Sequence, residues 1–105
     1  MTMFVYGELC KPLVLLEILG RVPNSEPALL DGFSRKVNPE TGYFHAVRHP
    51  TDLIAGLLLK SIKRNELEKL DCFENVGGGE YERIEADVKT LGSLTRKTAW
   101  VYVAT

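Results

Sequence analysis

The sequence contains few cysteines, no long apolar run and no excess of either charge. Cys10 and Cys72 are the only cysteines among 105 residues. A chain of this length can build a core without cross-links, so we expect two reduced thiols rather than a disulfide framework. No segment approaches the roughly 20 apolar residues of a membrane-spanning helix, and the first residues lack the basic start and apolar run of a signal peptide. These absences predict a soluble, cytoplasmic protein without a membrane partner.

The charges are balanced and scattered along the chain. Thirteen Lys and Arg residues against fourteen Asp and Glu residues give a formal net charge of -1. Such a distribution offers no basic patch to a phosphate backbone, so no nucleic-acid partner is predicted. Hydrophobic residues make up 45% of the chain, which is enough to form a core. We therefore predict a single domain over residues 1–105, whose oligomeric state the composition leaves open.

Common cofactor and metal motifs are also missing. The sequence has no GxGxxG, P-loop, HExxH or paired CxxC spacing. The glycines at 77–79 lack the Lys-Ser/Thr of a phosphate loop, which favours a flexible joint. The sequence does not decide whether this joint closes over a ligand. His45 and His49 have no evident third ligand nearby, and Cys10 is interpreted as an apolar thiol rather than a nucleophile. We expect neither a metal nor a cofactor.

The apolar pattern predicts two helices and about six strands. The helices are expected at 12–19, between Pro12 and Gly20, and at 65–73, where apolar residues recur three apart. The strands are expected at 2–6, 28–36, 43–47, 53–62, 82–90 and 98–103. Pro50 is expected to end the third strand, and the last two strands to pair as a hairpin. The elements lack a regular βαβ alternation and predict an α+β fold around a small, curved, mixed β-sheet or barrel.

Three short motifs stand in a characteristic order. Tyr6-Gly7-Glu8-Leu9 follows the first strand, Leu70-Asp71-Cys72-Phe73-Glu74 ends the second helix, and Tyr81-Glu82-Arg83 opens the next strand. Gly56 lies in a strand between them, and Ala99-Trp100-Val101-Tyr102 forms the final strand. Each motif alone is weak, but their order and separations resemble the gamma-glutamylcyclotransferase-like superfamily, which includes the AIG2-like proteins.

The resemblance covers residues 3 to 103 and implies both a fold and an activity. Family enzymes release 5-oxoproline without a metal or cofactor. The implied substrate is a small molecule with carboxylate and amine groups, namely a γ-glutamyl amine or a related isopeptide-like compound. The resemblance assigns Glu74 as the general acid/base, and the turn after the first strand as the donor of backbone N–H groups to a carboxylate. The substrate-binding residues it implies are Tyr6, Gly7, Glu8, Leu9 and Tyr81.

The position of Glu74 suits this role. It follows a helix C-terminus, where the negative end of the helix dipole disfavours a carboxylate, and Phe73 and Val76 are apolar neighbours. We therefore expect the pKa of Glu74 to be raised. Residue physics alone favours an exposed glutamate at a polar helix end, and only the resemblance favours a pocket residue instead.

Glu8 departs from the family pattern, which usually has Thr or Ser after Tyr-Gly. A carboxylate there repels an anionic substrate unless it points away or pairs with Arg48 or Arg83. Arg83 itself is either a substrate partner or a paired surface charge. The backbone donors of the turn stay usable if the Glu8 side chain is engaged elsewhere.

Two functions of other classes remain open at this point. One is a non-catalytic module that binds a small carboxylate on the same fold. The other is an interaction protein whose final strand, Trp100 to Val103, pairs with the edge of a partner.

Overall fold

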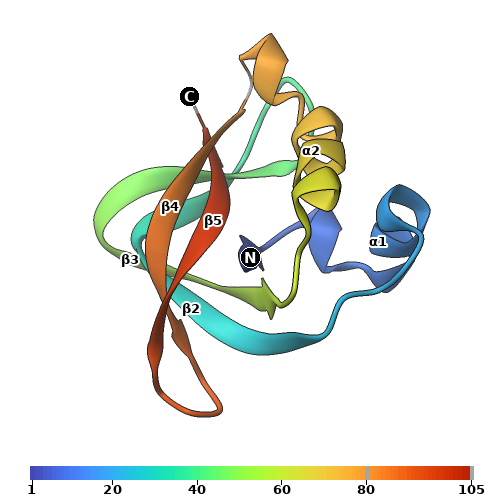
Figure 1. The fold of residues 1–105 in the computed structure, drawn as a ribbon. Helices are drawn as coiled ribbons and strands as arrows, with labels where there is room; N and C mark the ends of the chain where they lie inside the picture. Colours follow the sequence, from blue (N-terminus) through green and yellow to red (C-terminus); the bar gives the residue numbers. More distant parts are fainter. Residues whose placement is uncertain (80, 105) are drawn as a thin grey trace.

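Five strands close into a barrel in this computed structural model, which describes residues 1–79 and 81–104. Their order around the barrel is β1-β3-β2-β4-β5 (Figure 1). β1 and β5 run parallel where the barrel closes, and the other neighbours are antiparallel. The predicted mixed, curved sheet is confirmed. The strands are β1 (Met3–Val5), β2 (Ser25–Val37), β3 (Phe44–Leu59), β4 (Tyr81–Thr90) and β5 (Arg96–Ala104).

The barrel has five strands instead of about six because two expected strands form one. β3 runs straight through Pro50, which was wrongly expected to end a strand. The pairing passes from Phe33 opposite Arg48 to Asp31 opposite Leu53, so residues 49–52 of β3 bulge opposite Gly32 alone. A proline lacks the N–H that a ladder needs, and a bulge is a place where a strand tolerates it.

β5 is paired on both sides. Trp100 and Val101 pair with β1 on one side and with β4 on the other. The hypothesis that this strand segment pairs with the edge of a partner is therefore wrong for these two residues, because their edges are already occupied inside the barrel.

Two α-helices lie beside the barrel and share a core cluster with β1 (Figure 1). α1 (Pro12–Leu19) has the predicted bounds: proline suits a first turn, and Gly20 closes the helix with φ 74°. α2 (Arg64–Phe73) begins one residue before its predicted start. Two short 3-10 helices, η1 (Glu8–Cys10) and η2 (Val76–Gly78), flank them. No helix in the described part of the chain has the length and apolar character needed to cross a membrane.

The core has two parts that share β1. Phe4 lies in the cluster inside the barrel with Leu58 and Val101, whereas Met3 and Val5 belong to the cluster under the helices. Alternate residues of a strand point to opposite faces, so these three residues join the two clusters. The helical layer is thereby fixed against the end of β1.

A partly buried ion pair connects the segment that follows α1 to α2. Both carboxylate oxygens of Glu66 accept hydrogen bonds from Arg21, each at 2.7 Å, and the Lys63 N–H donates to the same carboxylate at 3.0 Å. The Arg21 hydrogen bonds lower the pKa of Glu66 to about 2 despite its burial.

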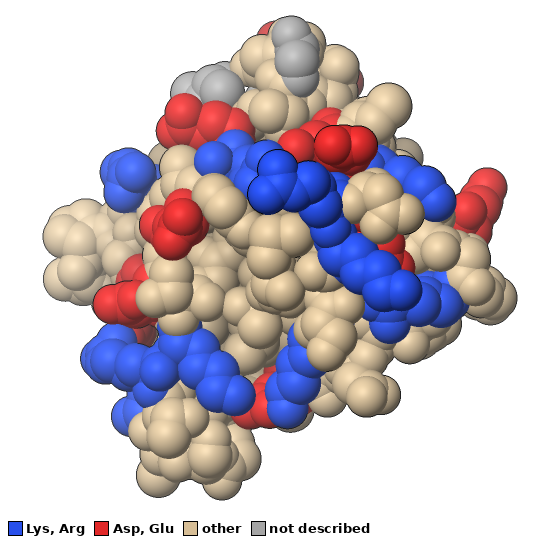
Figure 2. Space-filling view, viewed as in Figure 1, with Lys and Arg blue, Asp and Glu red and all other residues tan. Residues whose placement is uncertain are grey.

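On the face shown in Figure 2, basic and acidic side chains are interspersed.

Candidate functional site

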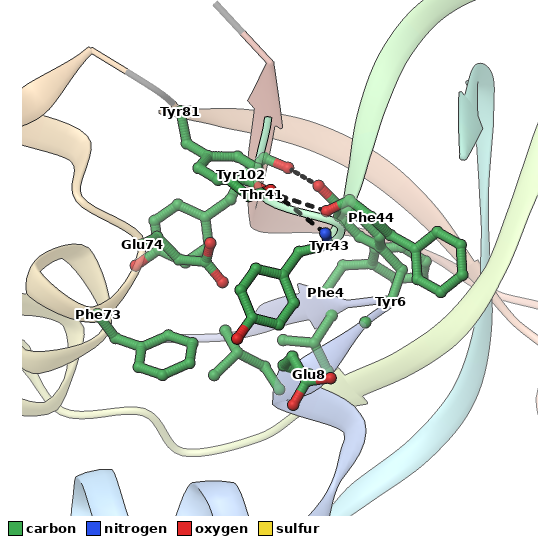
Figure 3. Close-up of a pocket in the computed structure, with 13 residues that line it drawn as sticks. Phe4, Tyr6, Glu8, Thr41, Tyr43, Phe44, Phe73, Glu74, Tyr81 and Tyr102 are labelled. Carbon is green, nitrogen blue, oxygen red and sulfur yellow. Dashed lines mark hydrogen bonds between the residues drawn. The ribbon is translucent and has the colours of Figure 1, made fainter. Parts of the chain in front are cut away.

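A cavity of about 220 Å³ lies at the end of the barrel where β1 and β5 finish and β3 and β4 begin. Figure 3 shows the side chains around it. The C-terminal end of α2, the η1 turn and the loop before β3 complete its wall. Every residue that the sequence assigned to the site lies on this lining, including residues that are far apart in the chain. These residues are Tyr6, Gly7, Glu8, Leu9, Glu74 and Tyr81.

Tyrosine hydroxyl groups hold the inner wall of the cavity together. The Tyr6 hydroxyl donates to the carbonyl of Tyr102 at 2.5 Å and accepts the N–H of Ala46 at 3.0 Å. The Tyr81 hydroxyl donates to the carbonyl of Phe44 at 3.0 Å. Burial raises the pKa of Tyr6, and the negative charge of Glu74 raises it further. The Tyr6 hydroxyl thus stays protonated and acts as a fixed structural link.

Asp71 connects the end of α2 to β4 and β5. One of its carboxylate oxygens accepts a hydrogen bond from the Tyr102 hydroxyl at 2.6 Å and from Arg83 Nε at 2.8 Å. The guanidinium of Arg83 also stacks over the ring of Trp100, 4.3 Å from its centroid. Burial raises the pKa of Tyr102, and so does its hydrogen bond to Asp71. Arg83 is therefore a partner of Asp71, and this pair joins the second and third sequence motifs. The first motif is linked to them through Tyr102, whose carbonyl accepts the Tyr6 hydrogen bond.

Glu74 caps the C-terminus of α2. Its N–H donates to the carbonyl of Leu70 at 3.0 Å, and Asn75 then leaves the helix with a left-handed φ of 54°. The Glu74 side chain is half-buried and lies on the cavity side of the helix end (Figure 3). The negative charge of Glu74 contributes to the raised pKa of both Tyr6 and Tyr102.

The Glu8 carboxylate is engaged by a neighbour on its own turn. Lys11 Nζ lies 2.8 Å from Glu8 Oε1. Neither expected partner is used, since Arg83 binds Asp71 and Arg48 stacks over a phenylalanine ring. Glu8 opens η1, whose hydrogen bonds begin with the Cys10 N–H, and the first N–H groups of a helix have no acceptor within it.

Three aromatic residues at the rim of the cavity were not predicted as site residues. Tyr43, Phe44 and Phe73 line the cavity, yet their exposed fractions are 57%, 41% and 46%. Tyr43 and Phe44 follow the turn at 38–42, in which the Gly42 N–H donates to the carbonyl of Asn38 at 2.8 Å. The sequence signal that could have identified Tyr43 and Phe44 is an aromatic pair directly after a turn. The inner-wall residue Tyr102, from the final-strand motif, was likewise not assigned to the site.

Cys10 and His49, which the sequence also offered as candidates, make structural contacts. Cys10 packs against the core under the helices, and burial raises its pKa, which disfavours the thiolate that a nucleophile needs. The ring of His49 accepts the N–H of Asp52 at 3.1 Å within the bulge of β3. In residues 1–79 and 81–104, no group of three His, Cys, Asp or Glu side chains is arranged to hold a metal ion.

The family model for "Gamma-glutamyl cyclotransferase, AIG2-like" matches residues 3–105. The chain belongs to this family. AIG2-like protein C of Arabidopsis thaliana is 35% identical over 101 residues, which cover 96% of this chain and 57% of the relative. The chain thus spans less than two-thirds of the length of this relative.

Solved structures share the fold of this family member. A solution structure of an Arabidopsis thaliana protein matches with a TM-score of 0.88 and 29% identity, over 98% of this chain and 67% of that one. A structure described as a gamma-glutamyl cyclotransferase matches with a TM-score of 0.84 over all of this chain and 66% of its own. Its 20% identity supports the common barrel and helices alone.

Proposed function

We propose that this protein releases 5-oxoproline from a γ-glutamyl amine, with Glu74 as the general acid/base. One observation carries the proposal. Glu74, at the end of α2, and the turn from Tyr6 to Leu9, at the end of β1, line the same cavity. Membership of a family named for γ-glutamyl cyclotransferase supports a reaction of this type.

The reaction needs one proton to move between two nitrogen atoms. The α-amine of the γ-glutamyl group attacks its own γ-carbonyl carbon, and the bond from that carbon to the leaving nitrogen breaks. The attacking nitrogen loses a proton and the leaving amine gains one, so a single carboxyl group can take the proton and return it. Such assistance is worth roughly 10²–10⁴ in rate. Glu74 is the ionisable group of the lining that we assign to this task, because the buried Tyr6 holds its proton.

The η1 turn supplies donors for the substrate carboxylate. The N–H groups of Glu8 and Leu9 lie in the first turn of this short helix, where no acceptor within the helix reaches them. The Glu8 side chain is held by Lys11, which partly offsets its repulsion of an anion. The apolar residues Phe4 and Val5 lie in the same lining and reduce the water around the reacting atoms.

Replacement of the proposed acid/base tests this function. Glu74→Gln keeps the size of the side chain and removes its proton-transfer capacity, so we expect at least a ~100-fold lower rate of 5-oxoproline release from a panel of γ-glutamyl amines. Glu68→Gln is the matched control, since Glu68 is exposed on the same helix and outside the cavity lining. Undiminished turnover by a folded Glu74→Gln protein would exclude the assignment.

The departure from the family pattern at Glu8 bears against turnover, and so favours a second candidate, a module that binds a small carboxylate without catalysis. The residue stands where the family usually has a hydroxyl side chain, and its charge alters the turn that faces the cavity. This function predicts thermal stabilisation by 5-oxoproline, lost in Tyr81→Ala, and no product from the panel. Product formation would exclude it.

A further inference from the structure

Aromatic side chains stay partly exposed at the rim of the cavity. Tyr43 lies in the loop before β3, Phe44 begins β3 and Phe73 ends α2, and all three line the same cavity. Figure 3 shows Phe73 beside Glu74 on the left, Phe44 on the right and the ring of Tyr43 between them. Clustered exposed apolar surface beside a cavity is a common mark of ligand contact.

The charged groups of the lining are all acidic. Glu8 and Glu74 are its charged side chains, and neither Lys nor Arg occurs among the described residues that form it. The nearby cations are occupied: Lys11 pairs with Glu8, and Arg83 pairs with Asp71. A second carboxylate on a ligand would therefore meet negative charge without a partner.

Arg35 contacts the rim but does not line the cavity. Its guanidinium stacks over the ring of Phe44, 4.3 Å from the centroid, and Arg35 is not part of the cavity lining. The arginine thus adds to the aromatic rim through a cation–π contact instead of presenting its charge inside the cavity. A carboxylated ligand would have to draw Arg35 away from this contact to pair with its charge.

The volume of the cavity indicates which part of a substrate it can hold. About 220 Å³ is smaller than the roughly 300–1,000 Å³ of a site for a drug-sized ligand, so it suits a small acyl group. The leaving amine then has to lie at the opening. We propose that the leaving amine is apolar or aromatic and carries no carboxylate, and that it packs against Tyr43, Phe44 and Phe73. This inference rests on the function proposed above.

Three substrates that differ by one group each test the inference. γ-Glutamyl-phenethylamine and γ-glutamyl-phenylalanine differ by a carboxylate, and γ-glutamyl-phenethylamine and γ-glutamyl-ethylamine differ by the ring. We expect kcat/KM for the phenethylamine compound to exceed each of the others about tenfold or more. Equal values would overturn the inference. A preference for the phenylalanine compound that disappears in Arg35→Gln would overturn it and identify a carboxylate site instead.

Rim variants test which residues cause the preference for an aromatic leaving amine. In Phe73→Ala and Tyr43→Ala, the about tenfold preference for the phenethyl over the ethyl compound should fall to about twofold. Leu94→Ala is the matched control, because Leu94 is 66% exposed, lies in the β4–β5 hairpin and is outside the lining. An unchanged preference in both rim variants would contradict the proposed contacts.

Equilibrium binding separates this inference from the proposed reaction. The same three compounds are titrated against Glu74→Gln by calorimetry, where no turnover is needed. Selective binding of the phenethylamine compound without 5-oxoproline release by the wild type would support the rim and refute the reaction. Turnover without selectivity would refute the rim alone, and neither binding nor turnover would refute both.

Discussion

The inner wall and the rim of the cavity both consist of aromatic residues, but they are held in different ways. On the inner wall, Tyr6 and Tyr102 are 8% and 3% exposed, and each hydroxyl has an acceptor on another element. On the rim, Tyr43 and Phe73 are about half exposed and lie on the loop before β3 and the end of α2. The inner wall is therefore set by folding, whereas the rim keeps surface available for a ligand.

The largest expected effect follows from crowding behind the inner wall. A Cβ atom at Gly56 would lie 2.2 Å from the carbonyl oxygen of Val5 and 2.8 Å from the ring of Phe4. Gly56→Ala should lower the free energy of unfolding by about 3 kcal/mol, because backbone and a buried ring must both move. Urea unfolding measures the loss.

A glycine elsewhere provides the control for this substitution. A Cβ atom at Gly92 would meet nothing within 4 Å, and Gly92 does not have a positive φ. Gly92→Ala should leave the midpoint of unfolding almost unchanged. Equal effects of the two substitutions would contradict the close approach of β1 and β3.

An intermediate effect is expected from the link between α2 and the barrel. Asp71→Asn keeps the shape of the side chain but weakens the hydrogen bonds from Tyr102 and Arg83, so we expect a loss of about 1–3 kcal/mol in the free energy of unfolding. Because Glu74 lies one turn further along this helix end, we also expect a lower kcat for 5-oxoproline release.

Rescue of the Asp71 link distinguishes positioning from general stability. Asp71→Glu retains a carboxylate for Arg83 and should recover part of the lost kcat, whereas Asp71→Asn should not. Thermal unfolding of both variants is followed in parallel. A kcat that tracks only the melting temperature would show that Asp71 acts through stability alone.

The smallest effect on stability is expected at the rim. Phe73 is 46% exposed, so Phe73→Ala should change the free energy of unfolding by no more than about 0.5 kcal/mol. A loss as large as that of Asp71→Asn would remove the distinction between wall and rim. Urea unfolding of the two variants under the same conditions makes the comparison.

Local signals predicted much of the fold. Pro12 and Gly20 delimit α1 because each acts on its own turn, and alternation along β4 places Val88 inside the barrel. Pro50 misled the strand prediction, since its tolerance depends on the bulge opposite Gly32, which lies on another strand. Proline chemistry in one segment does not reveal the register of its neighbour.

The sequence predicted residues that line the cavity better than it predicted their contacts. The motif order named Glu74 and the Tyr6 turn, but the hydrogen bond from Tyr6 to Tyr102 joins residues 96 positions apart. Phe73 continues the apolar spacing of α2 and so resembles a core residue, although the helix end carries it past the core. The pairing of Glu8 with Lys11 follows a local helical spacing that becomes visible once η1 is known.

The central claim, that Glu74 transfers the proton, is tested most directly by a graded series at this position. The initial rate of 5-oxoproline release is measured for the wild type, Glu74→Asp and Glu74→Gln with γ-glutamyl-phenethylamine and γ-glutamyl-ethylamine. Aspartate keeps a carboxyl group but is one methylene shorter, so we expect the highest rate for the wild type, a lower rate for Glu74→Asp and the lowest for Glu74→Gln. A rate for Glu74→Gln equal to or above that of Glu74→Asp would contradict the central claim.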